Sequence, residues 1–359
     1  MGGGQDSAPK VAGMTITAIS WDDTIGTDGL GGIRLLDQTL LPGVTADRTI
    51  TATAELVRAI AELAVRGAPA LGVAGAMGVA LAMDEGVRCG WAPAQVDAAV
   101  DAVRDARPTA VNLAWGVAQV RDLMPQGRDV VLAAARRVAA EDEAANRELS
   151  RLGADWVLAR VGRDRLRVLT HCNTGSLATS AWGTALGVIR ELQARGRLEF
   201  VYADETRPLL QGARLTAYEL AADGIPYAVQ ADGAAASTIL RGLVDFAVVG
   251  ADRIAANGDA ANKVGTLGVA LACHDAGVPF MVAAPWSTVD VGTLDGAAIE
   301  IEERPGDEVT TIAGIRIAPE GARGFNPAFD VTPARLIDAI CTERGVVEPQ
   351  RGQRPDDAS

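Results

Sequence analysis

The sequence is short of cationic side chains, of histidine and of cysteine, and each shortage excludes a class of protein. The 359 residues include 33 Lys and Arg against 46 Asp and Glu, which gives a formal net charge of −13. A broad cationic surface for nucleic acid or anionic lipid is therefore not expected. The two histidines and four scattered cysteines do not suit a zinc site, a Ser-His-Asp triad or a disulfide framework. We expect no metal and no other cofactor.

Aromatic residues make up only 4% of the chain, whereas 40 residues are glycine. This composition suits tightly packed helices and strand-to-helix turns better than an aromatic-rich β-sandwich, and it favours an α/β fold. The chain begins without an apolar signal region, and its most apolar stretch, residues 68–83, is shorter than the roughly 20 residues that span a bilayer. We expect a cytoplasmic protein without a membrane partner, in which residues 68–83 form a buried helix.

The length predicts two hydrophobic cores, since a single core tends to stop growing at roughly 250–300 residues. The first part reads as mainly helical, with short strands at 15–20 and 33–36. Hydrophobic periodicity predicts its helices at 51–65, 70–85, 93–106 and 112–123. A stretch rich in Ala, Glu and Arg, from Asp129 to about Arg160, predicts one long helix that joins two domains.

The pattern changes beyond residue 164, where short apolar runs alternate with helical ones. The predicted strands are 166–170, 200–203, 227–229, 246–250 and 280–284. The predicted helices are 177–195, 211–223, 234–241 and 266–276. Such alternation indicates a mainly parallel sheet. We assign a mainly helical N-terminal domain to 14–140, a connecting helix to 141–164, a parallel-sheet domain to 165–347, and flexible tails to 1–13 and 348–359.

Polar or reactive residues follow four successive predicted strands. These segments are His171-Cys172-Asn173-Thr174-Gly175, Asp204-Glu205-Thr206-Arg207, Asp232-Gly233 and Asp252-Arg253. In open parallel sheets, ligands bind outside the carboxyl ends of the strands. The four segments therefore predict one crevice that holds the chemistry.

Single residues at these strand ends admit two interpretations each. Cys172 is either a small buried hydrophobe or a reactive thiol. Asp252 is either a helix cap or partner of Arg253, or a carboxyl group whose pKa an apolar setting raises. The turn at Thr174-Gly175-Ser176 precedes a predicted helix, so its free backbone amides suit an anion. Local evidence alone leaves each pair of interpretations open.

Basic residues stand just before predicted helices elsewhere in the chain. Arg66 precedes Gly67-Ala68-Pro69, Arg107 precedes Pro108, and Asn262-Lys263 precedes Val264-Gly265-Thr266. These side chains are either solvated residues at helix ends or donors that hold a phosphate or a sugar.

Eight segments that occur in order along the chain resemble the methylthioribose-1-phosphate isomerases, whose family also contains the regulatory subunits of translation initiation factor 2B. The segments are Leu35-Leu36-Asp37-Gln38, Val65-Arg66-Gly67-Ala68-Pro69-Ala70, Arg107-Pro108-Thr109-Ala110-Val111-Asn112-Leu113, Thr170-His171-Cys172-Asn173, the run from Asp204 to Ala217, Val249-Gly250-Ala251-Asp252-Arg253-Ile254, Asn262-Lys263-Val264-Gly265-Thr266 and the run from Asn326 to Pro333. The resemblance covers almost the whole chain.

The resemblance implies a helical N-terminal domain, a Rossmann-like C-terminal domain, a homodimer and an aldose-ketose isomerase of methionine salvage. It implies that Cys172 and Asp252 are the catalytic pair. The substrate-binding residues that it implies are Arg66, Gly67, Ala68, Arg107, Gln211, Asn262 and Lys263. The sequence departs from the family pattern at Asp232-Gly233, where a larger polar residue is expected after Asp.

Three other functions compete with this interpretation. An isomerase of ribose 1,5-bisphosphate or of 5-deoxyribose 1-phosphate would use the same chemistry on another sugar. A noncatalytic subunit that binds a translation factor would share the fold, although retention of both Cys172 and Asp252 argues against it. An NAD-dependent dehydrogenase is disfavoured because no Gly-x-Gly-x-x-Gly follows a predicted strand.

Overall fold

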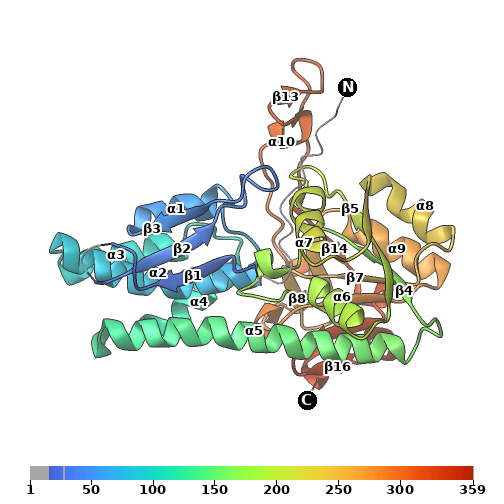
Figure 1. Ribbon diagram of the computed structural model, residues 1–359, viewed down its shortest axis with the longest axis horizontal. Coiled ribbons are helices and arrows are strands. Elements are labelled where there is room, and N and C mark those ends of the chain that lie inside the picture. The colour runs from blue at the N-terminus through green and yellow to red at the C-terminus, as the bar shows by residue number, and fades with distance from the viewer. Residues whose placement is uncertain (1–15, 27–28, 359) are drawn as a thin grey trace, which may run out of the picture.

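The computed structural model describes residues 16–26 and 29–358 and forms an α/β protein with a helical N-terminal part and a sheet-rich C-terminal part (Figure 1). The N-terminal part opens with a small antiparallel sheet of β1 (Ile19–Asp22), β2 (Gly32–Leu36) and β3 (Asp47–Ile50). One face of this sheet packs on helices and contributes Ile19, Ile33 and Leu35 to the first hydrophobic core. The predicted strand at 15–20 lies partly outside the described residues.

Four helices complete the first core. They are α1 (Thr53–Ala61), α2 (Ala68–Cys89), α3 (Pro93–Arg104) and α4 (Val111–Arg121). Helix α2 is long and apolar enough to cross a membrane by length and composition, yet 83% of its most apolar window is buried inside the protein. It ends at Gly90, whose φ of 65° gives the left-handed C-cap that glycine favours. The prediction of a buried helix over 68–83 is confirmed.

Helix α5 (Arg128–Leu158) spans 31 residues and contributes to both hydrophobic cores. Val131 and Ala135 lie in the core of the N-terminal part, whereas Leu149 and Val157 lie in the core of the C-terminal part. Figure 1 shows it running beneath both parts. The structure therefore has the predicted long helix between 129 and 160, and the domain boundaries assigned within it stay predictions.

The C-terminal part is built on a seven-stranded sheet. Its strands are β4 (Leu166–Thr170), β5 (Leu198–Asp204), β6 (Tyr227–Gln230), β7 (Phe246–Val249), β10 (Phe280–Ala283), β15 (Ala339–Thr342) and β16 (Gly345–Val347). They lie in the order β6-β5-β4-β7-β10-β15-β16, and all pairs are parallel except β15 with β16. Numbered along this part of the chain, the parallel strands run 3-2-1-4-5-6, the order of a doubly wound Rossmann fold.

Helices cover both faces of this sheet, so its central strands are buried on both sides. Helices α5, α6 (Ala185–Ala194) and α7 (Ala217–Ala222) pack on one face, and α8 (Ala235–Leu240) and α9 (Thr266–Ala276) pack on the other. Every residue of β7 and β10 is buried, as their continuous apolar runs predict. The order of strands reverses between β4 and β7, and ligands bind at such a switch point.

Two predicted helices begin later than expected. The segment predicted as a helix over 177–195 starts with a 3-10 turn (Ser176–Ala178), and α6 begins only at Ala185. Trp182 and Gly183 interrupt the helix because their φ angles of 70° and 92° are left-handed. The segment predicted over 211–223 starts with a π-helical turn (Gly212–Thr216) before α7.

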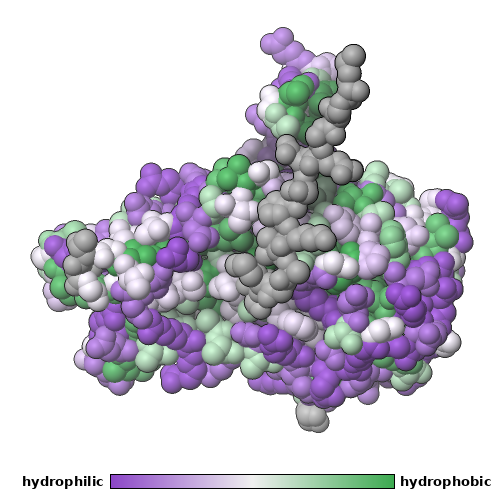
Figure 2. Space-filling model, in the orientation of Figure 1, coloured by the Kyte–Doolittle hydropathy of each residue, from purple (hydrophilic) through white to green (hydrophobic). Residues whose placement is uncertain are grey.

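A second sheet and a projecting arm were not predicted. The sheet contains β8 (Arg253–Ala255), β9 (Ala260–Lys263), β11 (Val289–Asp290) and β14 (Phe329–Thr332). The arm, residues 300–328, leaves the body next to this sheet and carries α10 (Asp307–Thr310), β12 (Thr311–Ile312) and β13 (Ile315–Arg316) (Figure 1). Figure 2 shows hydrophobic surface on the arm, where Ile315 and Phe325 are exposed. The flexibility predicted for 348–359 stays a prediction.

Candidate active site

A cavity of about 100 Å³ lies at the carboxyl ends of β4 and β7, where the strand order reverses. The starts of α2 and α4, the loop after β4, the end of β9 and the base of the arm all contribute to its wall. The nine residues predicted as site residues all line this cavity: Arg66, Gly67, Ala68, Arg107, Cys172, Gln211, Asp252, Asn262 and Lys263. The structure thus brings them together, and their individual roles stay predictions.

Cys172 follows β4 in a left-handed conformation with a φ of 64°. Its backbone N–H donates to Thr206 Oγ1 at 2.8 Å, and its carbonyl oxygen accepts from Thr216 Oγ1 at 2.6 Å. Non-glycine residues in this conformation persist where the surroundings hold them, and they cluster at functional sites. Burial raises the pKa of the Cys172 thiol, although the charges of Arg66 and Lys263 oppose this effect. The neutral thiol is therefore the resting form.

Asp252 lies three residues beyond the end of β7 and lines the cavity. Burial raises the pKa of Asp252, while the nearby cations Lys263 and Arg66 lower it in part. Arg253 lies 4.0 Å from Asp290, measured from Nη1 to Oδ2, so that its nearest ion-pair partner in the described part of the chain is not Asp252. A carboxyl group with a raised pKa can act as a proton donor near neutral pH.

Asn262 and Lys263 end β9 and face the same cavity. Lys263 Nζ donates to Ala328 O at 2.8 Å and lies 4.3 Å from the ring centroid of Phe329, its partner across the strand pair. Burial lowers the pKa of Lys263, so an incoming anion would favour its charged form. Asn262 Nδ2 donates to Thr266 Oγ1 at 3.0 Å, which fixes the amide beside the start of α9.

Gly67 and Gln211 suit the wall of the cavity for different reasons. Gly67 has a φ of 97°, and a Cβ at this position would lie 2.5 Å from Ala178 O, so only glycine fits here. Gln211 is 5% exposed, and its Oε1 is buried without a hydrogen-bond partner in the described part of the chain. Such an oxygen is ready to accept a hydrogen bond from a sugar hydroxyl.

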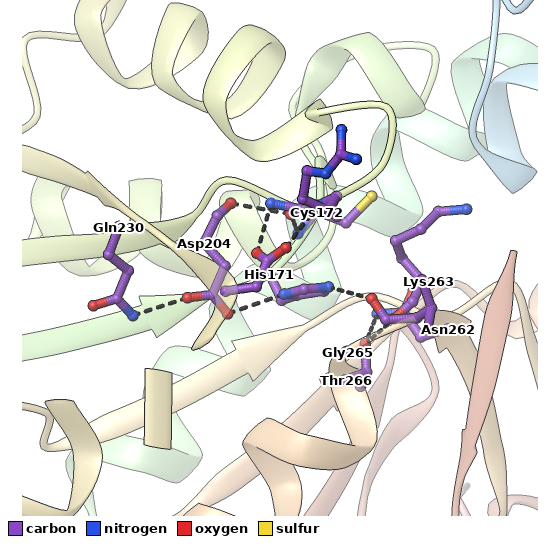
Figure 3. Close-up of polar contacts among 12 residues, drawn as sticks. His171, Cys172, Asp204, Gln230, Asn262, Lys263, Gly265 and Thr266 are labelled. Atoms are coloured by element: carbon purple, nitrogen blue, oxygen red, sulfur yellow. Dashed lines mark hydrogen bonds and ion pairs between the residues drawn. The ribbon is translucent and has the colours of Figure 1, made fainter. Parts of the chain in front are cut away.

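His171 lies outside the cavity wall and joins two segments that line the cavity, the loop after β4 and the end of β9 (Figure 3). Its Nε2 donates to Val264 O at 2.9 Å, because a carbonyl oxygen can only accept. Its Nδ1 lies 2.9 Å from Asp204 Oδ2, and Gln230 Nε2 donates to Asp204 Oδ1 at 2.8 Å. Burial lowers the pKa of His171, but Asp204, Asp232 and the Val264 carbonyl together outweigh burial, so the pKa is raised overall. His171 thereby anchors the end of β4, next to Cys172, to the residue after Lys263.

One group of potential metal ligands exists among the described residues, namely His171, Asp204 and Asp232, with ligand atoms within 4.8 Å of one another. Each of these side chains is already engaged in hydrogen bonds. Asp232 accepts from the backbone N–H groups of Thr206 and Arg207 at 2.7 and 2.6 Å. Neither Asp232 nor Gly233, where the sequence departs from the family pattern, lines the cavity.

The turn at Thr174-Gly175-Ser176, whose backbone amides suit an anion, holds a side chain of the protein at Ser176 instead of a ligand. The N–H groups of Ser176 and Leu177 donate to the carboxylate of Glu219 at 2.7 and 3.3 Å. An anion does occupy the turn, but it is a side chain of the protein. Local sequence carries no signal for this contact, because Glu219 lies 43 residues beyond Ser176.

Five basic side chains line the cavity, and carboxylates neutralise three of them. Arg107 Nη2 lies 2.8 Å from Glu302 Oε2, Arg304 pairs with both Glu302 and Glu308, and Arg253 lies 4.0 Å from Asp290. Among the described residues, Arg66 has hydrogen bonds only to the neutral Asn173, and Lys263 has one to a carbonyl oxygen and a contact with the Phe329 ring, but neither has an ion-pair partner. The two cations without a carboxylate partner match the charge of one phosphate dianion.

The sequence matches the model of one known family over residues 64–349, whose description is "Initiation factor 2 subunit family". The chain belongs to this family. The matched range includes all nine predicted site residues and ends just beyond the last strand of the seven-stranded sheet.

Relatives within the family carry isomerase names. A methylthioribose-1-phosphate isomerase of Nitrosococcus oceani is 48% identical over 94% of this chain and 96% of its own length. A probable bifunctional methylthioribose-1-phosphate isomerase/methylthioribulose-1-phosphate dehydratase of Nocardia farcinica is 50% identical over 92% of this chain, which spans only 59% of that longer protein.

Two solved structures of the family have the same fold along nearly the whole chain. The 5-methylthioribose 1-phosphate isomerase of Pyrococcus horikoshii OT3 superposes with a TM-score of 0.83 at 36% identity, covering 96% of both chains. A structure titled translation initiation factor eIF-2B, subunit delta, from A. fulgidus superposes with a TM-score of 0.81 at 38% identity, covering 96% of this chain and 99% of that one. Fold alone therefore does not separate the isomerases of the family from proteins with translation-factor names.

Proposed function

We propose that this chain is an aldose-ketose isomerase that converts 5-methylthioribose 1-phosphate to 5-methylthioribulose 1-phosphate in methionine salvage. The observation that carries the proposal is the cavity at the switch point of the sheet. It brings Cys172, the acid Asp252 and two unneutralised cations together in a protein about 50% identical to relatives named for this reaction. The described residues thus provide a binding site for one phosphate next to a proton donor.

The anomeric oxygen of this substrate carries phosphate, so the ring cannot open by simple loss of a hydroxyl proton. Asp252 donates a proton to the ring oxygen, which breaks the bond from C1 to that oxygen and leaves positive charge at C1. A hydrogen then moves from C2 to C1, and the hydroxyl proton on C2 returns to the Asp252 carboxylate as the ketone forms. This sequence restores the enzyme and requires no external oxidant or reductant.

The structure bears on the role of Cys172 in the hydrogen transfer. A thiolate base would take the proton from C2, whereas a direct hydride shift needs no base at that carbon. Because burial raises the pKa of the Cys172 thiol, the hydride shift, with the sulfur beside the cationic intermediate, is the favoured route. The thiol sulfur is polarizable, and Cys172 lines the cavity in which the cationic intermediate would form.

Turnover of 5-methylthioribose 1-phosphate labelled with deuterium at C2 tests both the function and the route. We expect proton NMR to show the ketose with deuterium retained at C1, because a hydride shift does not exchange with water. Loss of the label to solvent would indicate a Cys172 thiolate base instead. Higher kcat/KM for ribose 1,5-bisphosphate or 5-deoxyribose 1-phosphate would overturn the substrate assignment. Failure to convert any of the three sugars would favour a noncatalytic subunit.

We further propose a cytoplasmic homodimer that needs no metal and has neither nucleic acid nor membrane as a partner. The strongly negative net charge supports the absence of nucleic acid and membrane as partners. Exposed Leu294 and Phe325 offer apolar surface that a second copy could cover in a dimer. Light scattering is expected to give twice the chain mass, and activity is expected to survive a chelator. A stable monomer would refute the dimer, and activity restored by a divalent ion after chelation would refute metal independence.

A further inference from the structure

Glu219 is a fully buried carboxylate on α7 that lies outside the cavity and contacts the loop after β4. Its oxygens accept from Asn173 Nδ2 at 2.8 Å and from Arg190 Nη2 at 2.9 Å, in addition to the backbone N–H groups of Ser176 and Leu177. All four partners are N–H donors. A carboxylate with only donors around it is held in one orientation.

Arg190 on α6 makes this buried charge tolerable and extends its hold on the loop. The guanidinium is 9% exposed, and it pairs with both Glu219 and Asp223. It also donates to Ser176 Oγ at 3.1 Å and to the carbonyl oxygen of Trp182. A buried ion pair persists only where further hydrogen bonds satisfy its remaining groups. Here those bonds go to the segment that follows Cys172, so the pair fixes the shape of that segment.

Asn173 connects this pair to the cavity. Because the Glu219 carboxylate can only accept, the NH₂ group of the Asn173 side chain must face it, and the amide oxygen must face the other way. That oxygen accepts from Arg66 Nη1 at 3.0 Å, and the Asn173 backbone carbonyl accepts from Arg66 Nη2 at 2.6 Å. These contacts use two of the five N–H donors of Arg66 and leave the others for an anion.

We propose that Glu219 is a positioning residue that acts through Asn173 to aim the Arg66 guanidinium at the substrate phosphate. The inference rests on the proposed isomerase function. Without the carboxylate, the Asn173 NH₂ group keeps only its longer contact with Thr216 Oγ1, at 3.3 Å, and rotation of the amide then brings this group toward the Arg66 donors in place of the amide oxygen. The Arg66 guanidinium then loses the acceptor that holds its orientation, and phosphate binding weakens although Arg66 itself is unchanged.

A double-mutant cycle between Glu219→Gln and Arg66→Ala tests the proposal. Glu219→Gln is expected to lower kcat/KM about tenfold, which is within the range of interaction energies between residues of one hydrogen-bond network. The loss is expected mainly as a higher KM, because the affected group binds phosphate. In the Arg66→Ala background the same substitution is expected to change kcat/KM less than twofold, because the group it positions is gone. Asp223→Asn is the matched control. It removes the other carboxylate of Arg190 without touching Asn173, and kcat/KM is expected to stay within twofold of the parent.

A merely structural role for Glu219 would give a different result, namely the same loss of kcat/KM with and without Arg66. That outcome overturns the proposal. If Glu219→Gln does not fold, Asn173→Ala replaces it in the same cycle with the same expectation. If the parent enzyme turns over none of the sugars, the proposed function fails separately. In that case calorimetry measures the affinity for inorganic phosphate of the parent, both single variants and the double variant. Glu219→Gln is then expected to weaken phosphate binding in the parent but not in the Arg66→Ala background.

Discussion

Replacing Asp252 with asparagine is expected to lower kcat by about 10²–10⁴-fold, the usual contribution of a general acid. Asparagine keeps the shape of the side chain but has no proton to give to the ring oxygen. In the parent, kcat/KM is expected to fall as pH rises through the raised pKa of Asp252, because the deprotonated carboxylate cannot act as the acid. The Asp252→Asn variant is expected to lack this decline. Stopped assays across pH, with thermal unfolding to confirm the fold, measure both effects.

The substitution Cys172→Ala belongs to the same experiment, since both side chains line one cavity. If the two residues act in one chemical step, the double variant is expected to lose little more activity than either single variant. Cys273→Ala is the matched control, because Cys273 is also fully buried but lies on α9 outside the cavity wall. A loss below tenfold for either site variant would point to packing, and strictly multiplicative losses would place the residues in separate steps.

The second large effect concerns stability at the crossing of α2 and α4. A Cβ added at Gly116 would lie 1.9 Å from Gly72 O, which is backbone and cannot rotate away. Gly116→Ala is therefore expected to force the helices apart and to reduce the free energy of unfolding by about 1–3 kcal/mol or more. Chemical denaturation of the parent and of the variant measures this change.

Gly268→Ala serves as the control for the same chemical change in a helix with space. Gly268 lies on α9, is exposed, and has no atom within 4 Å of an added Cβ. This variant is expected to be more stable by about 0.4–1 kcal/mol, because alanine restricts the unfolded chain more than glycine does. If both substitutions change the free energy of unfolding equally, close contact between the backbones of α2 and α4 is not the reason for glycine at position 116.

Much of the C-terminal sheet could be predicted because its strands are mainly apolar runs bounded by polar turns. The prediction for 166–170 matches β4 at both ends, and β7 and β10 differ from the predictions by one residue. Strands β8, β9 and β14 could not be found in the same way, since they are only partly apolar. The pairing of β9 with β14 joins residues about 70 positions apart, as with Asn262 and Asp330, and local sequence carries no signal for such a contact.

The candidate site could be predicted as a location and as a set of nine residues, but its charge balance could not. The rule for parallel sheets locates the crevice, and the family resemblance selects the residues. Glu302 pairs with Arg107 across 195 positions of sequence, and Glu219 accepts from the backbone of a turn whose amides suit an anion. Both contacts depend on how distant segments fold back on one another. Local patterns predict three cations at the site, but they do not predict that one of them, Arg107, is paired with a carboxylate.

Helix α5 restricts how this protein can open. The stretch between its two sets of core residues, 139–148, contains neither glycine nor proline, so it lacks the usual points at which helices kink. Arg66 and Arg107 come from one side of the cavity and Cys172 and Asp252 from the other, and a hinge between the sides would have to bend this helix. Exchange of substrate and product should therefore depend on local rearrangement of loops and of the arm rather than on separation of two rigid halves.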